Sequence, residues 1–257
     1  LRLASLLPAG PRQSIQRPAD TDTTEPIGTV HSTVTSRSIV SPAGATPNCG
    51  RRATSSPEPM SISVGGPITN TRARRVTIER SAAALARALD EAGHPEQFQP
   101  WWSPCLWREN RRLGANWSGT DCLALDVDHD DRRALTPDER SALHQLLPRL
   151  PGSVFYHTPK GFRVVAILSR PVDDQELVQR AQLGFAELIA DATASLAWLH
   201  VDRSVTADAA ARALYTPRGN AKPEKEPHPR DFPTLVLSEV LFDVDELAAL
   251  APPPTPK

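Results

Sequence analysis

Four aspartates end the segment LALDVDHDD, residues 123–131, directly after a short apolar stretch. Asp126 and Asp128 stand two residues apart at the end of an expected strand, so in extended geometry their side chains share one face. Two carboxylates this close repel each other, and a divalent cation relieves the repulsion. Oxygen ligands of this kind favour Mg²⁺ or Mn²⁺. The spacing predicts a metal site, with an ordinary solvated acidic loop as the alternative.

Known motifs narrow the chemistry of this acidic segment. An EF-hand loop beginning at Asp126 needs glycine sixth and glutamate twelfth; Asp131 and Pro137 stand there, which excludes it. A haloacid-dehalogenase-like phosphatase, with Asp126 as nucleophile, usually has threonine or valine where this chain has Asp130, so it is a minor alternative. Nucleotidyl transfer by a metal pair needs a third carboxylate from a neighbouring strand. Asp202, in LHVDRSV, can supply it, although a lone aspartate there also suits a helix cap or turn.

An expected hairpin between these acidic sites has the composition of an anion-binding turn. It consists of the strands SVFYHT and RVVAILS, joined by the turn PKGF. Thr158, Lys160, Gly161 and Arg163 offer a hydroxyl, two cations and backbone N–H groups, which together suit a triphosphate. A solvated hairpin tip is the alternative, because lysine and glycine are common in turns.

Taken in order, these segments resemble the archaeo-eukaryotic primase superfamily, in particular the primase-like catalytic domains of phage and plasmid replication proteins. The matching segments are LALDVDHD, HTPKGFRVVAIL, HVDRSV and ARALYTP, the last with Arg212, Tyr215 and Pro217. The resemblance spans roughly residues 101–220. It implies a primase- or RRM-like catalytic core and a DNA primase or polymerase activity, a metal-dependent nucleotidyl transfer in the replication of a phage, plasmid or similar element.

The resemblance also implies roles for single residues. Asp126, Asp128 and Asp202 would be the catalytic carboxylates and would hold two divalent ions, while Lys160 and Arg163 would bind the triphosphate, with Arg212 a weaker third candidate. Many family members carry a histidine where this chain has Arg163. A non-catalytic DNA-binding replication protein with a degenerate primase fold is therefore the alternative. The implied partners are a DNA template, nucleoside triphosphates and a separate replicative helicase.

The segment PWWSPCLWRENRRLGANW combines aromatic and basic residues. Arginines bind phosphates and aromatic rings stack on unpaired bases, so Arg108, Arg111 and Arg112 are candidate nucleic-acid-binding residues. The tryptophans are expected to pack in the core instead, since tryptophan is usually buried. Single histidines near helix ends or acidic loops are expected to be solvated, which concerns His129, His144 and His200.

Composition restricts the class of protein. The chain has 257 residues, 39% of them hydrophobic, and a net charge of −1, which argues against wholesale binding of a polyanion. Its three cysteines, Cys49, Cys105 and Cys122, have no metal-ligand spacing and indicate reduced thiols in a cytoplasmic protein. No apolar run approaches the roughly 18 residues that cross a bilayer, so no membrane association is expected.

The pattern of elements indicates an α+β domain with a mostly antiparallel sheet and flanking helices. Residues 1–72, rich in Ser, Thr, Pro and Gly, are expected to be a long disordered tail or not genuine protein. The domain is expected over 73–250 and a Pro-rich tail over 251–257. Helices are expected over residues 77–93, 136–147, 172–194 and 243–250, and strands over 121–127, 153–158, 163–169 and 234–242. Thr136, Pro137 and Glu139 form a capping-box helix start.

Overall fold

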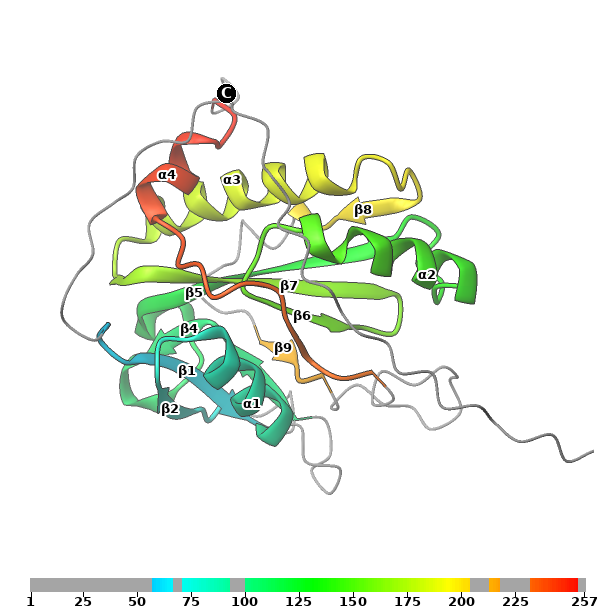
Figure 1. The fold of residues 1–257 in the computed structure, drawn as a ribbon. Helices are drawn as coiled ribbons and strands as arrows, with labels where there is room; N and C mark the ends of the chain where they lie inside the picture. Colours follow the sequence, from blue (N-terminus) through cyan, green and yellow to red (C-terminus); the bar gives the residue numbers. More distant parts are fainter. Residues whose placement is uncertain (1–56, 67–70, 93–99, 204–212, 218–231, 254–257) are drawn as a thin grey trace, which may run out of the picture. The chain divides into compact units, whose positions relative to one another are not determined.

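The structure is a computed structural model that describes residues 57–66, 71–92, 100–203, 213–217 and 232–253 (Figure 1). The strands are β1 (Met60–Gly65), β2 (Arg74–Ile78), β3 (Trp101–Ser103), β4 (Cys105–Trp107), β5 (Trp117–His129), β6 (Val154–His157), β7 (Gly161–Val172), β8 (Leu199–Val201), β9 (Leu214–Tyr215) and β10 (Leu235–Val236). The helices are α1 (Ala82–Ala92), α2 (Pro137–Leu146), α3 (Gln175–Thr193) and α4 (Val244–Ala249), with 3-10 turns η1 (Arg108–Asn110), η2 (Gly114–Asn116) and η3 (Leu147–Arg149).

Two antiparallel sheets form the framework. The smaller has the strand order β2-β1-β3-β9, and the larger has the order β10-β6-β7-β5-β4, with β8 also paired to β5. The expected α+β class with antiparallel strands is confirmed, but the strands divide into two sheets rather than one. Among the described residues, every helix is too short or too polar to cross a lipid bilayer.

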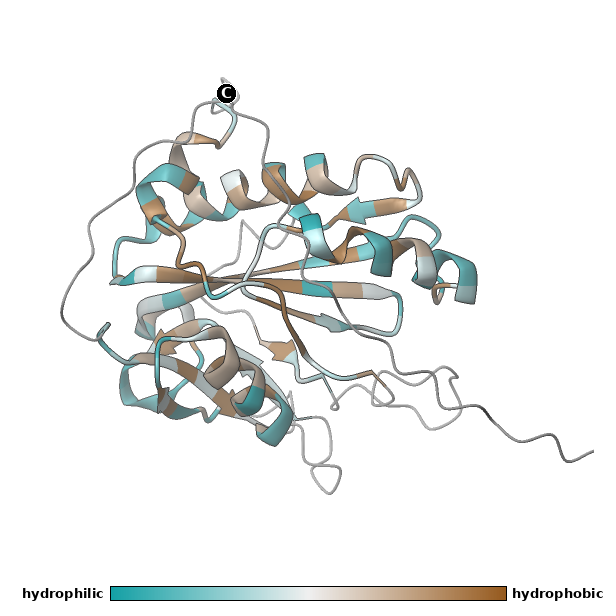
Figure 2. Cartoon of the chain, viewed as in Figure 1, coloured by the Kyte–Doolittle hydropathy of each residue, from teal (hydrophilic) through white to brown (hydrophobic). Residues whose placement is uncertain are grey.

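The larger sheet is buried on both faces, which explains why β5 appears in the sequence as a nearly continuous apolar run. Leu123, Leu125 and Val127 point to a core shared with α2, α3 and α4, whereas Cys122 and Ala124 belong to a second core shared with α1 and β1. Figure 1 shows α3 and α4 on one side of this sheet and the smaller sheet with α1 on the other. Figure 2 shows the apolar residues along the central strands.

Several local predictions are confirmed. Thr136 caps α2, and its hydroxyl and Glu139 form the two reciprocal bonds of a capping box. The hairpin of β6 and β7 and the helices α3 and α4 also lie where the sequence placed them. The first predicted helix begins five residues late, at Ala82, because Thr77 and Ile78 pair with β1 as part of β2.

Two segments differ from the expectations. Residues 60–65 were expected in the tail, yet they form the central strand β1, because Met60, Ile62 and Val64 alternate along it and are buried. Residues 1–56 of the expected tail lie outside the described part. The strand expected over 234–242 is reduced to β10. Beyond it Glu239 accepts bonds from the first N–H groups of α1, at 2.7 and 3.1 Å, and the chain meets the sheet again at Phe242, through an isolated bridge to Leu168 of β7.

Candidate functional site

A row of polar side chains crosses the larger sheet near the end of β5. Asp126 of β5 pairs with Arg163 of β7, and Arg163 in turn pairs with Tyr156 of β6. Residues directly opposite each other on neighbouring strands share one face. Arg163 Nη2 accordingly forms an ion pair with Asp126 Oδ2, while Nη1 donates to the Tyr156 hydroxyl at 2.9 Å. Nη1 also donates to the backbone carbonyl of Tyr215 in β9, at 3.2 Å, so the row contacts the smaller sheet.

Burial and charge act in opposite directions on Arg163. Burial alone would lower the pKa of its guanidinium, but the neighbouring Asp126 and Tyr156 raise that pKa above its usual value. Burial also raises the pKa of the Tyr156 hydroxyl. Arg163 is therefore a fixed cation whose two Nη atoms are already bonded to Asp126, Tyr156 and Tyr215.

The other two predicted acidic residues are neighbours of Asp126 in the sheet, but only Asp128 shares its cavity. Asp128 lines the same cavity as Asp126, which confirms that the two side chains share a face. Asp202 follows β8, and its N–H donates to the backbone carbonyl of Asp126 at 2.9 Å. Burial is the main cause of a raised pKa at Asp128, and the charges of Asp126 and Asp202 raise it further, against the opposing effect of Lys160 and Arg163. Asp128 therefore lies in a partly buried place where negative and positive side chains meet.

A cavity of about 250 Å³ lies where these residues meet. It is lined by Asp126, Asp128, Tyr156, His157, Thr158, Pro159, Lys160, Arg163, Tyr215, Thr216 and Pro217. The structure therefore brings together residues from the acidic strand, the hairpin and the segment LYTP, which are far apart in the sequence. The weaker candidate Arg212 lies outside the described residues.

Gly161 was predicted to help bind a triphosphate, but it does not line the cavity. The close pairing of β7 with β5 explains instead why a glycine stands there. Gly161 pairs with Asp128 where β7 approaches β5 closely. A Cβ atom at this position would lie 1.9 Å from the backbone oxygen of Val127. The packing of the two strands therefore requires glycine here, whether or not its backbone also meets a ligand.

Four residues that line the cavity each have a buried side-chain atom without a hydrogen-bond partner: Asp126 Oδ1, His157 Nδ1, Thr158 Oγ1 and Arg163 Nε. Buried polar atoms in folded proteins nearly always have partners, and each unmet one costs about 1–3 kcal/mol. Arg163 Nε and the Thr158 hydroxyl can donate, whereas the carboxylate oxygen of Asp126 can only accept or bind a cation. The cavity is therefore suited to a ligand that brings both an anionic group and a cation.

His157 is a member of this cavity that the site prediction left out. Its Nε2 lies 3.1 Å from Nε2 of His144, and the two rings stack at 5.3 Å. Burial lowers the pKa of His157 to about 3, with the charges of Arg140 and His144 adding to the effect. The ring is therefore neutral near pH 7. The sequence did contain a signal for the burial of His157: it stands two residues after the core residue Phe155 in the same strand, so both side chains point to the same face.

The expectation that His129 is solvated is wrong. It is 3% exposed, its Nε2 lies 3.3 Å from Glu139, and its ring stacks on Trp198 at 5.7 Å. His144 is exposed but stacks on His157. Both histidines fall at points where α2 or the segment before β8 packs against the end of the larger sheet, which their local sequence does not reveal.

The tryptophans belong to the core, as expected. Trp101, Trp102 and Trp107 are at most 2% exposed, and Trp102 Nε1 donates to the Tyr156 hydroxyl at 2.8 Å. The predicted nucleic-acid-binding residues lie away from the cavity lining: Arg108 and Arg111 are exposed, and Arg112 lies over the Trp101 ring at 5.2 Å from its centre. Their binding to nucleic acid stays a prediction.

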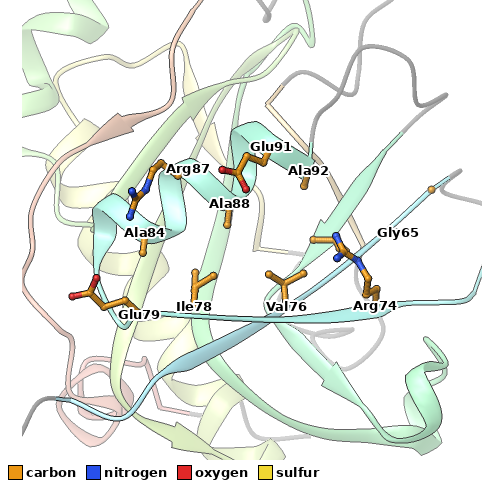
Figure 3. A pocket seen from close by; sticks show the side chains of 12 residues that line it. Gly65, Arg74, Val76, Ile78, Glu79, Ala84, Arg87, Ala88, Glu91 and Ala92 are labelled. Carbon is orange, nitrogen blue, oxygen red and sulfur yellow. The ribbon is translucent and has the colours of Figure 1, made fainter.

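A larger cavity of about 680 Å³ separates α1 from β2 (Figure 3). Val76 and Ile78 of the strand point toward Ala84 and Ala88 of the helix, so the facing walls of this cavity are apolar in their middle part. Within the described part of the chain, none of the buried unpartnered polar atoms belongs to a residue lining it. It therefore lacks the chemistry of the smaller cavity.

Comparisons with known proteins add a likeness of fold. No family model and no curated protein matches the chain. A solved structure, the AEP domain (PP-N190) of the cyanophage S-2L primase-polymerase (PrimPol), matches 76% of this chain and 89% of its own, at 10% sequence identity and a TM-score of 0.42.

Proposed function

We propose that the chain is a primase-type nucleotidyltransferase that uses a divalent metal ion to join nucleotides on a DNA template. The observation that carries this proposal is the smaller cavity. It joins the carboxylates of Asp126 and Asp128 to the cationic side chains of Lys160 and Arg163, and it leaves donors and an acceptor buried without partners. A nucleoside triphosphate with its metal ion supplies the complementary charges.

Asp126 and Asp128 offer carboxylate oxygens, the ligands that suit one Mg²⁺ or Mn²⁺ ion. The buried Asp126 Oδ1 has no hydrogen-bond partner, and the pKa of Asp128 is raised by burial and by the charge of Asp126. A cation bound there would give Asp126 Oδ1 a partner and would stabilise the ionised form of Asp128. In the described residues, no group of three or more His, Cys, Asp or Glu side chains is arranged to hold a metal ion. Asp126 and Asp128 would hold Mg²⁺ or Mn²⁺, with Asp202 as the neighbouring carboxylate.

The bound cation would neutralise charge on the phosphates and lower the pKa of the attacking primer hydroxyl. The chain's own residues would bind and orient the triphosphate. Lys160 is exposed at the cavity's edge and can move its ammonium to a phosphate, whereas Arg163 is fixed and presents only Nε. The Thr158 hydroxyl can donate a further bond. Such placement and positive charge are the main requirements of phosphoryl transfer.

The ion pair between Arg163 and Asp126 favours a second candidate function. Arg163 occupies one of the two oxygens through which Asp126 could bind a metal ion. A chain in which this pair replaces the metal would bind DNA without catalysing nucleotide transfer. Metal dependence separates the two functions, because only the enzyme requires divalent ions.

The test is the incorporation of labelled nucleotides on a DNA template with Mg²⁺ or Mn²⁺. The variant carries Asp126→Asn with Asp128→Asn, and the matched control carries Asp130→Asn with Asp131→Asn, two exposed carboxylates of the same segment. We expect incorporation by the wild type and the control, and its loss in the variant. A single Asp128→Asn change should also abolish it and leaves the ion pair of Asp126 intact. Equal incorporation in all proteins, or none in the wild type, would refute the proposal.

A further inference from the structure

Two arginine-rich segments that are distant in the sequence lie side by side on the surface. Residues 71–75, TRARR, and 108–112, RENRR, are joined by an antiparallel bridge between Arg72 and Arg111 and by two backbone hydrogen bonds of 2.8 Å. Together they carry six arginines and one acidic residue, Glu109. We call this the arginine surface: Arg72, Arg74, Arg75, Arg108, Arg111 and Arg112.

Four arginines of this surface are exposed and are absent from the ion pairs of the described residues. Among the described residues, Arg74, Arg75, Arg108 and Arg111 form no ion pair. By contrast, the surface arginines Arg133, Arg170 and Arg203 are each paired with an acidic side chain. Like charges held close together repel each other, and a polyanion offsets that repulsion.

The local backbone creates a hollow between the two segments. Glu109 and Asn110 both have left-handed dihedrals, with φ of 56° and 53°, although neither is glycine. Such residues cost energy and are retained where the surrounding structure fixes them. The turn borders a cavity of about 430 Å³ lined by Arg72, Ala73, Glu109, Asn110 and Arg111. A phosphate group can therefore enter between the arginines instead of only touching a flat surface.

The position of the surface connects it to the smaller cavity. Arg112 lies over the ring of Trp101, and Trp101 pairs in register with Tyr215, which lines that cavity. In an extended segment Arg72 and Arg74 share one face and are about 7 Å apart, a span that can contact more than one backbone phosphate. At the other end, Arg74 also borders the larger cavity (Figure 3).

We propose that the arginine surface binds the phosphate backbone of a single nucleic-acid strand and leads it toward the cavity at Asp126. Arginine suits this partner because its planar fork matches phosphate oxygens. The nearby tryptophans are buried, so the contacts are to phosphates and not by stacking on bases. The direction toward the cavity rests on the proposed function, whereas binding of the strand does not.

The test measures the binding of fluorescently labelled oligo(dT) by anisotropy at several salt concentrations, with EDTA present. The variant carries Arg75→Gln, Arg108→Gln and Arg111→Gln. The matched control carries Arg149→Gln, Arg170→Gln and Arg180→Gln, which are also exposed and change the net charge equally. We expect affinity about tenfold weaker in the variant, with a salt slope smaller by about 2, because each phosphate contact on a single strand contributes about 0.7. The control should bind as the wild type does.

Three results would overturn the inference: no binding by the wild type, equal weakening in variant and control, or a loss of binding to vesicles containing phosphatidylserine with oligo(dT) binding unchanged. Thermal unfolding of both proteins verifies that they are folded. Nucleotide incorporation is measured separately with the Asp126 and Asp128 changes. Weakened oligo(dT) binding without any metal-dependent incorporation would support this inference and refute the proposed function.

Discussion

Replacing Arg163 with methionine should destabilise the protein strongly, because Arg163 is the buried partner of Asp126. The two side chains are 7% and 17% exposed, so water screens their attraction only weakly. Arg163→Met leaves the Asp126 carboxylate without its cation and removes one of the two donors to the Tyr215 carbonyl, the other being the Tyr156 hydroxyl. Breaking a buried pair costs about 3–5 kcal/mol. At roughly 3 °C per kcal/mol for a domain of this size, even the lower value lowers Tm by about 9 °C.

The assay is urea and thermal unfolding of a double-mutant cycle made from Arg163→Met and Asp126→Asn. Because the double variant removes both charges, it should be more stable than the sum of the single losses predicts, by about 2 kcal/mol. The matched control is Arg170→Met, also in β7, whose ion pair with Asp245 joins side chains that are 50% and 65% exposed. That change should cost less than about 1 kcal/mol. Additive single losses, or equal losses at Arg163 and Arg170, would refute the reasoning.

Two further predictions concern the hairpin. Gly161→Ala should lower the free energy of unfolding in urea by about 2–3 kcal/mol, because its Cβ would lie 1.9 Å from the backbone oxygen of Val127. The control Gly114→Ala, whose Cβ would have no atom within 4 Å, should change it by less than about 0.5 kcal/mol. Equal effects of the two changes would contradict this prediction. The pKa of His157 is about 3 in the folded protein, against an ordinary value of 6.5, so on acidification the unfolded chain binds the proton first. The contribution of neutral His157 to the free energy of unfolding is therefore complete above pH 6.5 and is lost as the pH falls toward 3. Between pH 6.5 and 4.5 the wild type should lose about 2 kcal/mol more than His157→Gln does, and parallel pH profiles would rule this out.

The parts of the fold that the sequence predicted have local signals. The capping box at Thr136 involves residues three apart, and the hairpin of β6 and β7 has its turn residues in sequence. Asp126 and Asp128 share a face because strand geometry has a period of two, so their common wall in the cavity was predictable as well.

The parts that the sequence did not predict depend on distant partners. β1 is a short alternating run within a Ser- and Pro-rich stretch, and it is held by pairing with β2 and β3. The ion pair of Arg163 follows from the register of β5 against β7, which places Asp126 opposite it. The sequence pattern assigned Arg163 to a triphosphate, and only the register shows that Arg163 also neutralises a predicted metal ligand.

The strand β3 lies between the two proposed binding sites, which has a thermodynamic consequence. Its neighbouring residues Trp101 and Trp102 point to opposite faces: the first lies under Arg112, and the second donates to Tyr156 at the cavity. If a ligand on one side shifted β3, the contacts on the other side would change as well. Such a coupling is reciprocal, so a nucleic-acid strand that tightened nucleotide binding by a given factor would itself be bound more tightly by the same factor once the nucleotide is present.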